Sequence, residues 1–271
     1  MPMALVDQFL PDELWERIAP MLPVHARSPQ GGRPPADTRA TLAGILWMLR
    51  TGSRWKDLPE EFPHSSTCWR RFRAWQQQGV LDAILAQLSE AADDSKISGR
   101  FESYADGTFK AAKKGGTEIG VTKAGKGNKI MLVVNSHGVP RAALLAPANP
   151  AEVNLIEPTL EQSFSQSQEY DILIYDKAAD SDPLRNRLKD LGIELICPHR
   201  KNRTAEPTQD RRKLKRYKRR SIVERTFAWL DNFRRLVARY EWYAEMFMAF
   251  IQMACILILM RRLYKTPLPN N

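Results

Sequence analysis

The chain has 271 residues, with 41 Lys and Arg against 31 Asp and Glu, a formal net charge of +10 and an apolar content of 43%. This apolar content excludes a wholly disordered chain, and the length allows one large domain or two modest ones. The segment from Arg200 to Arg220 holds eleven Lys or Arg and two acids, so it carries +9 and all other residues together carry +1. Such a concentrated basic segment indicates a polyanionic partner, because neutralised phosphates release counterions.

The cysteines and the apolar runs bear on the cellular compartment of the protein. Cys68, Cys197 and Cys255 are widely spaced and form no Cys-x-x-Cys pair, which argues against a disulfide framework or a cysteine zinc site and fits a reducing cytoplasm. Residues 1–22 lack the basic start and apolar run of a signal peptide. The apolar stretch from Met246 to Met260 is short for a membrane span, so we predict a buried C-terminal helix.

Residues 12–92 show only helical patterns. The first predicted helix covers residues 12–22, and the second lies between Asp37, which caps it, and Gly52, which ends it. Ser65 and Ser66 are expected to cap a third helix at 67–78, and a fourth follows at 81–88. This zone is therefore predicted to be all-α.

The third predicted helix carries Arg70, Arg71 and Arg73, and it follows a short helix at 55–58 and a turn. This order is typical of a helix-turn-helix DNA-binding domain, in which the three arginines would contact DNA. An ordinary helical bundle with a solvated arginine face has the same spacing, so the spacing alone leaves both interpretations open.

Beyond a polar linker at 93–99 the pattern changes to short apolar runs bounded by Gly, Pro, Asn and Asp. Strands are predicted at 101–105, 130–134, 139–145, 172–175 and 193–197, with helices at 153–164 and 183–191. Helices return from residue 211 to about residue 264. We predict an α+β or α/β fold with three domains or segments: helix-turn-helix at 1–92, linker at 93–99, and a mixed-sheet domain with C-terminal helices at 100–271.

Three carboxylates stand out by their position. Asp106 and Asp176 each follow a predicted strand, and Glu224 lies in the basic helix on one face with Tyr217 and Arg220. Acids at strand ends converge on one edge of a sheet, and hard oxygen ligands suit Mg²⁺ or Mn²⁺. Two such ions would support phosphodiester chemistry.

Each acid also has an ordinary interpretation. An aspartate before a glycine is a common turn, and a glutamate in a basic helix is often an ion-pair partner. Asp180 and Asp182 compete with Asp176, although Asp182 followed by Pro183 is typical of a helix start. A basic surface beside an acidic strand-end pair favours the metal-site interpretation.

At this point the residues resemble those of a known family. Three blocks are similar to the catalytic blocks of bacterial insertion-sequence transposases of the DDE class, in the branch called family five. The first block is Asp106-Gly107-Thr108-Phe109 with Gly120-Val121-Thr122; the second is Asp176-Lys177-Ala178 with Asp180-Ser181-Asp182-Pro183; the third is Val223-Glu224-Arg225-Thr226-Phe227 with Phe233-Arg234-Arg235-Leu236. The resemblance extends to the loop Gly31-Gly32-Arg33-Pro34-Pro35 and the turn Trp55-Lys56-Asp57-Leu58-Pro59.

The resemblance implies an RNase H-like core in which Asp106, Asp176 and Glu224 hold Mg²⁺ or Mn²⁺, with two ions expected. It implies cleavage at the ends of an insertion element with water as the nucleophile, followed by joining of the 3′ hydroxyl to target DNA. The expected partners are double-stranded DNA and a second copy of the chain, in the bacterial cytoplasm. Together with the basic segment it suggests these DNA-binding residues: Arg70, Arg71, Arg73, Lys177, Arg211, Arg212, Lys213, Lys215, Arg216, Tyr217 and Arg220.

The chain also departs from the family pattern. Asp231 stands where the family has a lysine, so no end-binding lysine is carried over. Tyr175, Ala179 and Asn135 also differ from the common residues, but none of them is an expected metal ligand. Two alternatives follow: a catalytically decayed transposase that acts as a DNA-binding repressor, and a metal-dependent nuclease without strand transfer.

Overall fold

A computed structural model describes residues 4–24, 31, 34–92, 96–97, 99–208 and 211–265. Gly32 and Arg33 of the glycine-proline loop, most of the predicted linker, and Asp210 of the basic segment lie outside the described residues.

The N-terminal zone is helical, as predicted. Its elements are α1 (Leu5–Phe9), α2 (Asp12–Ile18), η1 (Ala19–Met21), α3 (Thr38–Thr51), η2 (Trp55–Asp57), α4 (Ser65–Gln77) and α5 (Val80–Ala92). Asp37 caps α3 by accepting a hydrogen bond from the backbone N–H of Ala40 at 2.7 Å, and Gly52 ends it in the left-handed conformation. The cap of α4 differs from the prediction, because His64 Nδ1 accepts from the backbone N–H of Ser66.

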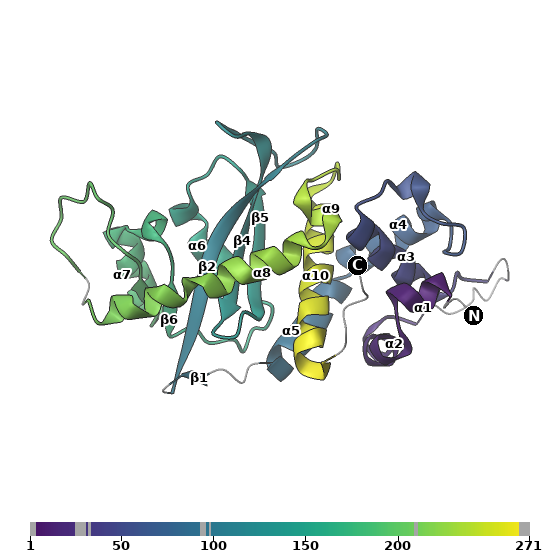
Figure 1. Cartoon of the computed structure of the whole chain (residues 1–271), viewed down its shortest axis with the longest axis horizontal. Coiled ribbons are helices and arrows are strands. Elements are labelled where there is room, and N and C mark those ends of the chain that lie inside the picture. The colour runs from purple at the N-terminus through teal and green to yellow at the C-terminus, as the bar shows by residue number, and fades with distance from the viewer. Residues whose placement is uncertain are drawn as a thin grey trace.

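The strands form one mixed sheet (Figure 1). They are β1 (Lys96–Ile97), β2 (Arg100–Ala111), β3 (Gly120–Thr122), β4 (Gly125–Asn135), β5 (Pro140–Pro147), β6 (Ile172–Ile174) and β7 (Glu194–Ile196). β5, β4 and β2 pair antiparallel, β6 and β7 continue from β2 in parallel, and β1 and β3 pair with β2 and β4 at the edges. β2 is therefore the strand at which the sheet changes from antiparallel to parallel.

Alternating side chains of the strands divide the core into two clusters, one on each face of the sheet. Tyr104, Leu132 and Ile174 pack on the face covered by α8 and α10, and Ala105, Val133 and Leu173 pack on the opposite face with α6 and α7. The remaining elements are η3 (Glu152–Asn154), α6 (Ile156–Glu161), η4 (Lys177–Ala179), α7 (Asp182–Asp190), η5 (Lys213–Arg220), α8 (Ser221–Asp231), α9 (Arg234–Val237) and α10 (Ala244–Tyr264). The predicted fold class, with N-terminal helices, a mixed sheet and C-terminal helices, is confirmed.

Helix α10 lies between the sheet and the N-terminal helices (Figure 1). By length and composition it is apolar enough to cross a membrane, but 78% of its most apolar window is buried inside the protein. It packs against α4, α5 and β5, and one apolar cluster contains residues of all these elements. The predicted buried C-terminal helix is confirmed, and the division into domains stays a prediction.

Candidate active site

The sheet brings Asp106 and Asp176 to the same edge. In the parallel pairing of β2 with β6, the last register pair is Tyr104 with Ile174, so both aspartates lie two residues beyond it. The sequence predicted that Asp106 follows a strand, but Asp106 lies inside β2. The reason is that the antiparallel partner β4 keeps pairing with β2 as far as Ala111. The convergence of the two acids follows from the end of the parallel pairing.

Arg220 joins this edge of the sheet to the third acid. Its Nη2 donates to Asp106 Oδ2 at 2.7 Å, and its Nη1 lies 3.2 Å from Glu224 Oε1. Arg220 ends η5 and Glu224 lies in the first turn of α8, so their side chains share one helix face. The guanidinium therefore lies between two of the three predicted metal ligands.

Burial dominates the electrostatics of Asp106, whose side chain is 14% exposed. Burial raises the pKa of this carboxyl, the Arg220 guanidinium acts in the opposite direction, and the charge of Glu152 adds to the rise. A charged group in this position is costly unless cations face it.

Glu152, in η3, is a fourth acid at the site that the sequence analysis did not single out. Its Oε2 accepts from the Tyr175 hydroxyl at 3.0 Å, and its Oε1 lies 3.7 Å from Lys129 Nζ. Gly107 makes room for it, because a Cβ there would lie 3.1 Å from the Glu152 carboxylate and 2.9 Å from Met131 Sδ. Burial first, and then the charge of Glu152, raise the pKa of Tyr175 far above its usual range, so its hydroxyl remains a hydrogen-bond donor.

The acids do not form a closed metal cluster. Across the described residues, no three His, Cys, Asp or Glu side chains are grouped closely enough to hold a metal ion. Asp106 and Glu224 both contact the Arg220 cation, and Asp176 Oδ1 accepts from the backbone N–H of Ala178 at 2.6 Å. All candidate donors are carboxylate oxygens, a set that suits hard divalent cations.

Two other acids of the second block lie elsewhere. Asp180 is buried and is bound by His199, Arg185 and Arg203, and Asp182 lies in the first turn of α7 behind a Ser181 cap. Both aspartates pair with side chains of the loop after β7. Asp180 and Asp182 thus have other partners than Asp106 and Asp176.

The three-residue repeat of η5 places the side chains of the basic segment after β7 in three rows. Lys213, Arg216 and Arg219 form one row that pairs with acids of the sheet, namely Glu194 and the buried Glu102. Leu214 and Tyr217 form a second row that packs on the core, and this row ends at Arg220. The third row, with Arg212, Lys215 and Lys218, is exposed, as is Arg211.

The comparisons with known proteins identify the family. The model of the transposase DDE domain matches residues 91–259, and the model described as a putative transposase of the IS4/5 family matches residues 10–85. The chain belongs to the DDE transposases of the IS4/5 family.

Two relatives come from Burkholderia cepacia. A putative transposase for insertion sequence element IS402 is 33% identical over 143 residues, covering 50% of this chain and 64% of that protein. An uncharacterized 16.2 kDa protein of insertion element IS402 is 48% identical over 95 residues, covering 32% of this chain and 64% of its own length. The chain thus spans just under two thirds of the length of these curated relatives.

A solved structure supports the fold. A piggyBac transposase, determined by cryo-EM as a synaptic complex with hairpin DNA, superposes with a TM-score of 0.58 at 8% identity, over 96% of this chain and 74% of that one. At this identity the likeness concerns the fold alone, which is that of an RNase H-like transposase.

The predicted DNA-contacting arginines of helix α4 have different surroundings. Arg70 is exposed. Arg71 reaches back to the start of α3, with Nη1 donating to Thr38 Oγ1 at 3.3 Å. Arg73 lies between two aromatic rings, 5.3 Å from the Trp69 centroid and 4.9 Å from that of Tyr243. Arg70 is thus the member of the three with the most open access to a ligand.

Lys177 is exposed beside Asp176. A shallow hollow of about 350 Å³ is lined by both residues together with Arg200 and Lys201. The Arg200 side chain is fixed at the edge of this hollow, because its Nη2 donates to the backbone carbonyl of Ala178 at 2.6 Å. Cationic side chains therefore lie directly next to one of the predicted metal ligands.

Proposed function

We propose that the chain binds the ends of an insertion element and catalyses metal-dependent DNA cleavage and strand transfer, with Asp106, Asp176 and Glu224 as the metal-holding and catalytic acids. The observation that carries this proposal is the shared register position of Asp106 and Asp176, with Arg220 linking Asp106 to Glu224. Membership of the DDE transposase family supports it.

The acids fit one or two Mg²⁺ or Mn²⁺ ions by donor chemistry. When bound, such ions activate an attacking oxygen and stabilise the leaving oxygen on phosphorus. Asp106 is the least exposed of the acids contacted by Arg220, and a bound cation offsets the cost of its buried charge as Arg220 does in the structure described.

Arg220 has a second task in this proposal. Its planar guanidinium suits both carboxylates and phosphates, so release from Asp106 leaves it beside the scissile phosphate while its backbone stays at the start of α8, the helix of Glu224. Tyr217, one turn of η5 earlier, packs on the core and fixes the direction of that row. The residues thus exchange a carboxylate–arginine contact for a phosphate–arginine contact when DNA is present.

For DNA binding we propose a division between two surfaces. The exposed row of η5 with Arg211, together with Lys177, contacts phosphates near the acids, and the helix-turn-helix region at 1–92 recognises the terminal repeats through Arg70. Lys213 and Arg216, which were predicted to bind DNA, pair with acids of the sheet; we propose that they mainly orient η5. The proposed active form is a homodimer on DNA, and residues 100–271 are the proposed catalytic domain.

The test uses purified protein, Mg²⁺ or Mn²⁺, and a labelled duplex carrying the repeats that flank the gene. End cleavage and joined products are expected, and Asp106→Asn, Asp176→Asn and Glu224→Gln should abolish both. Asp182→Asn, an acid outside the site, is the matched control. Calorimetric Mn²⁺ binding without DNA should weaken in Asp106→Asn, which reports on the metal site independently of activity.

The alternatives give distinct results. If the protein binds the ends but cleaves them with neither metal, the proposal is wrong and the chain is a decayed transposase that acts as a repressor. Cleavage without joined products, at every ratio of target DNA to labelled duplex, would indicate a metal-dependent nuclease without strand transfer.

A further inference from the structure

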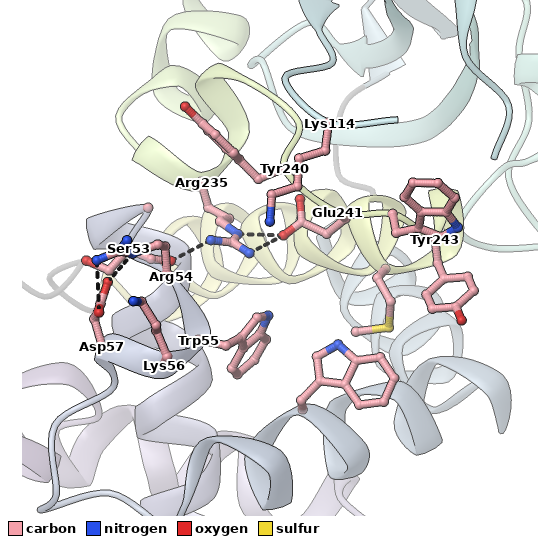
Figure 2. A pocket seen from close by; sticks show the side chains of 14 residues that line it. Ser53, Arg54, Trp55, Lys56, Asp57, Lys114, Arg235, Tyr240, Glu241 and Tyr243 are labelled. Atoms are coloured by element: carbon pink, nitrogen blue, oxygen red, sulfur yellow. Dashed lines mark hydrogen bonds and ion pairs between the residues drawn. The ribbon is translucent and has the colours of Figure 1, made fainter. Parts of the chain in front are cut away.

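A cleft of about 910 Å³ lies away from the acids, where the N-terminal helices meet the connection from α9 to α10 (Figure 2). Its walls come from η2, from Trp69 of α4, from Lys114 after β2 and from residues 240–243. Figure 2 shows Trp55 on one side and Tyr240 and Lys114 on the other, with the Lys114 side chain directed into the space between them. None of the proposed catalytic residues lines this cleft.

The cleft concentrates aromatic rings that the core leaves exposed. Trp242 is 58% exposed, Tyr240 47% and Tyr243 38%, and all three lie in one connection between two helices. Exposing large rings forgoes the stabilisation that burial would bring, and clustered exposure of this kind marks binding surfaces. Trp55 and Trp69 add two further rings from the opposite wall.

The backbone that carries these rings is held firmly. The Trp242 carbonyl accepts from Thr117 N at 3.0 Å and from Arg239 Nη2 at 2.9 Å, and Arg239 is 1% exposed. The Trp242 ring itself lies against Gly115, where an added Cβ would come within 3.1 Å of it. Rings held in this way lose little conformational entropy when a ligand stacks on them.

The charges around the cleft favour an anionic ligand. Its lining contains four cationic and two acidic side chains, a net charge of +2. Both acids already have cationic partners, since Asp57 pairs with Arg54 and Glu241 pairs with Arg235. Lys56 and Lys114 are exposed on opposite walls, so an anion entering the cleft meets cations from both sides.

We infer that this cleft binds unpaired nucleotides of DNA by stacking their bases on the aromatic rings, with Lys56 and Lys114 at the phosphates. Aromatic rings interleaved with cations are the typical means of binding single strands, whereas the base faces of an intact duplex are already stacked on one another. The inference rests on the proposed action on DNA and extends it to a second site. The backbone N–H of Arg239, at the start of the connection that carries the rings, donates to the Ala111 carbonyl. Ala111 lies about 17 Å along β2 from Asp106, which is the length of about five base pairs of duplex DNA.

The test measures fluorescence anisotropy of a labelled oligothymidylate with the full chain, in buffer without divalent metal. Trp242→Ala and Tyr240→Ala should each weaken binding about tenfold, the equivalent of about 1.4 kcal/mol. Trp242→Phe should recover most of the affinity, and unchanged thermal unfolding of the variants shows that they fold. Tyr264→Ala removes an exposed aromatic ring at the far end of α10 and should bind as the wild type does.

Two outcomes would overturn the inference: wild-type affinity of both cleft variants for the single strand, or an equal loss in Tyr264→Ala. If wild-type affinity of the cleft variants is accompanied by a change from dimer to monomer, the cleft is assigned to a second copy of the chain. Failure of the proposed function is distinguishable, because Asp106→Asn should retain single-strand binding whether or not the wild type cuts duplex ends.

Discussion

The most direct test of the tertiary structure concerns Asp180, which organises the loop after β7. Its side chain is 2% exposed, and its carboxylate accepts hydrogen bonds from the backbone N–H of Arg200 at 2.8 Å, from His199 Nδ1 at 2.9 Å, and from Arg185 and Arg203 at 3.0 and 3.2 Å. Asp180→Asn removes the charge and keeps the shape, so it tests the electrostatic contribution of this cluster.

The magnitude follows from the pKa. Burial by itself would raise the pKa of Asp180, but the hydrogen bonds from Arg200 and His199 and the neighbouring cations lower it from 3.8 to about 2. A depressed pKa of this size is equivalent to about 2 kcal/mol of folding stability at pH 7. Because the folded-state pKa is the lower one, this stability is fully present above about pH 5, falls to about half near pH 3, and is lost below about pH 2.

The assay is urea denaturation of the wild type and Asp180→Asn at a series of pH values. We expect the variant to be less stable by about 2 kcal/mol at pH 7, with the difference between the two proteins shrinking as the pH falls from 5 to 3. Asp182→Asn is the control, because Asp182 also pairs with Arg203 but is 41% exposed and should cost no more than about 1 kcal/mol. A wild-type-to-Asp180→Asn difference that stays constant over this pH range would refute the reasoning.

Three further variants test packing and charge. Gly127→Ala should destabilise the sheet by about 1–3 kcal/mol in urea denaturation, because its Cβ would lie 2.3 Å from the Lys110 carbonyl oxygen; wild-type stability would contradict that close approach. Phe250→Ala should cost about 3–5 kcal/mol, since Phe250 is fully buried on α10, and separate unfolding transitions for helices and sheet would contradict the shared core. Arg211→Gln with Lys215→Gln should lower the salt slope of duplex binding by about 2 without loss of stability, and an unchanged slope would remove the exposed row from the proposed DNA surface.

Most of the local structure was predictable from short stretches of sequence. Asp37 and Gly52 mark both ends of α3, and the short apolar runs located β4, β5, β6 and β7. Such signals depend on neighbouring residues, so they can be read without knowledge of the rest of the chain. The cap of α4 was mistaken, since His64 supplies an acceptor that the usual cap preferences assign to serine.

The candidate site was predictable only in part. The sequence marked Asp106 and Asp176, but the reason that they are near each other is the parallel register of β2 with β6. Glu152 carried no sequence signal, because its place beside Gly107 and Tyr175 depends on how η3 packs against the sheet. The side chains that line the cleft are likewise distant in sequence and meet only in the folded chain.

The sequence alone determined the order of the main helices and strands, without β1 and β3. It also marked the three acids and the basic charge between Arg200 and Arg220, because these are properties of contiguous residues and of motifs. The tertiary structure decided what each basic side chain faces. Lys213 and Arg216 turn to acids of the sheet, Arg220 turns to Asp106, and Lys215 faces solvent. Which of these cations meets an acid depends on contacts across more than a hundred residues in some cases, and only the packing of η5 on the sheet brings those partners together.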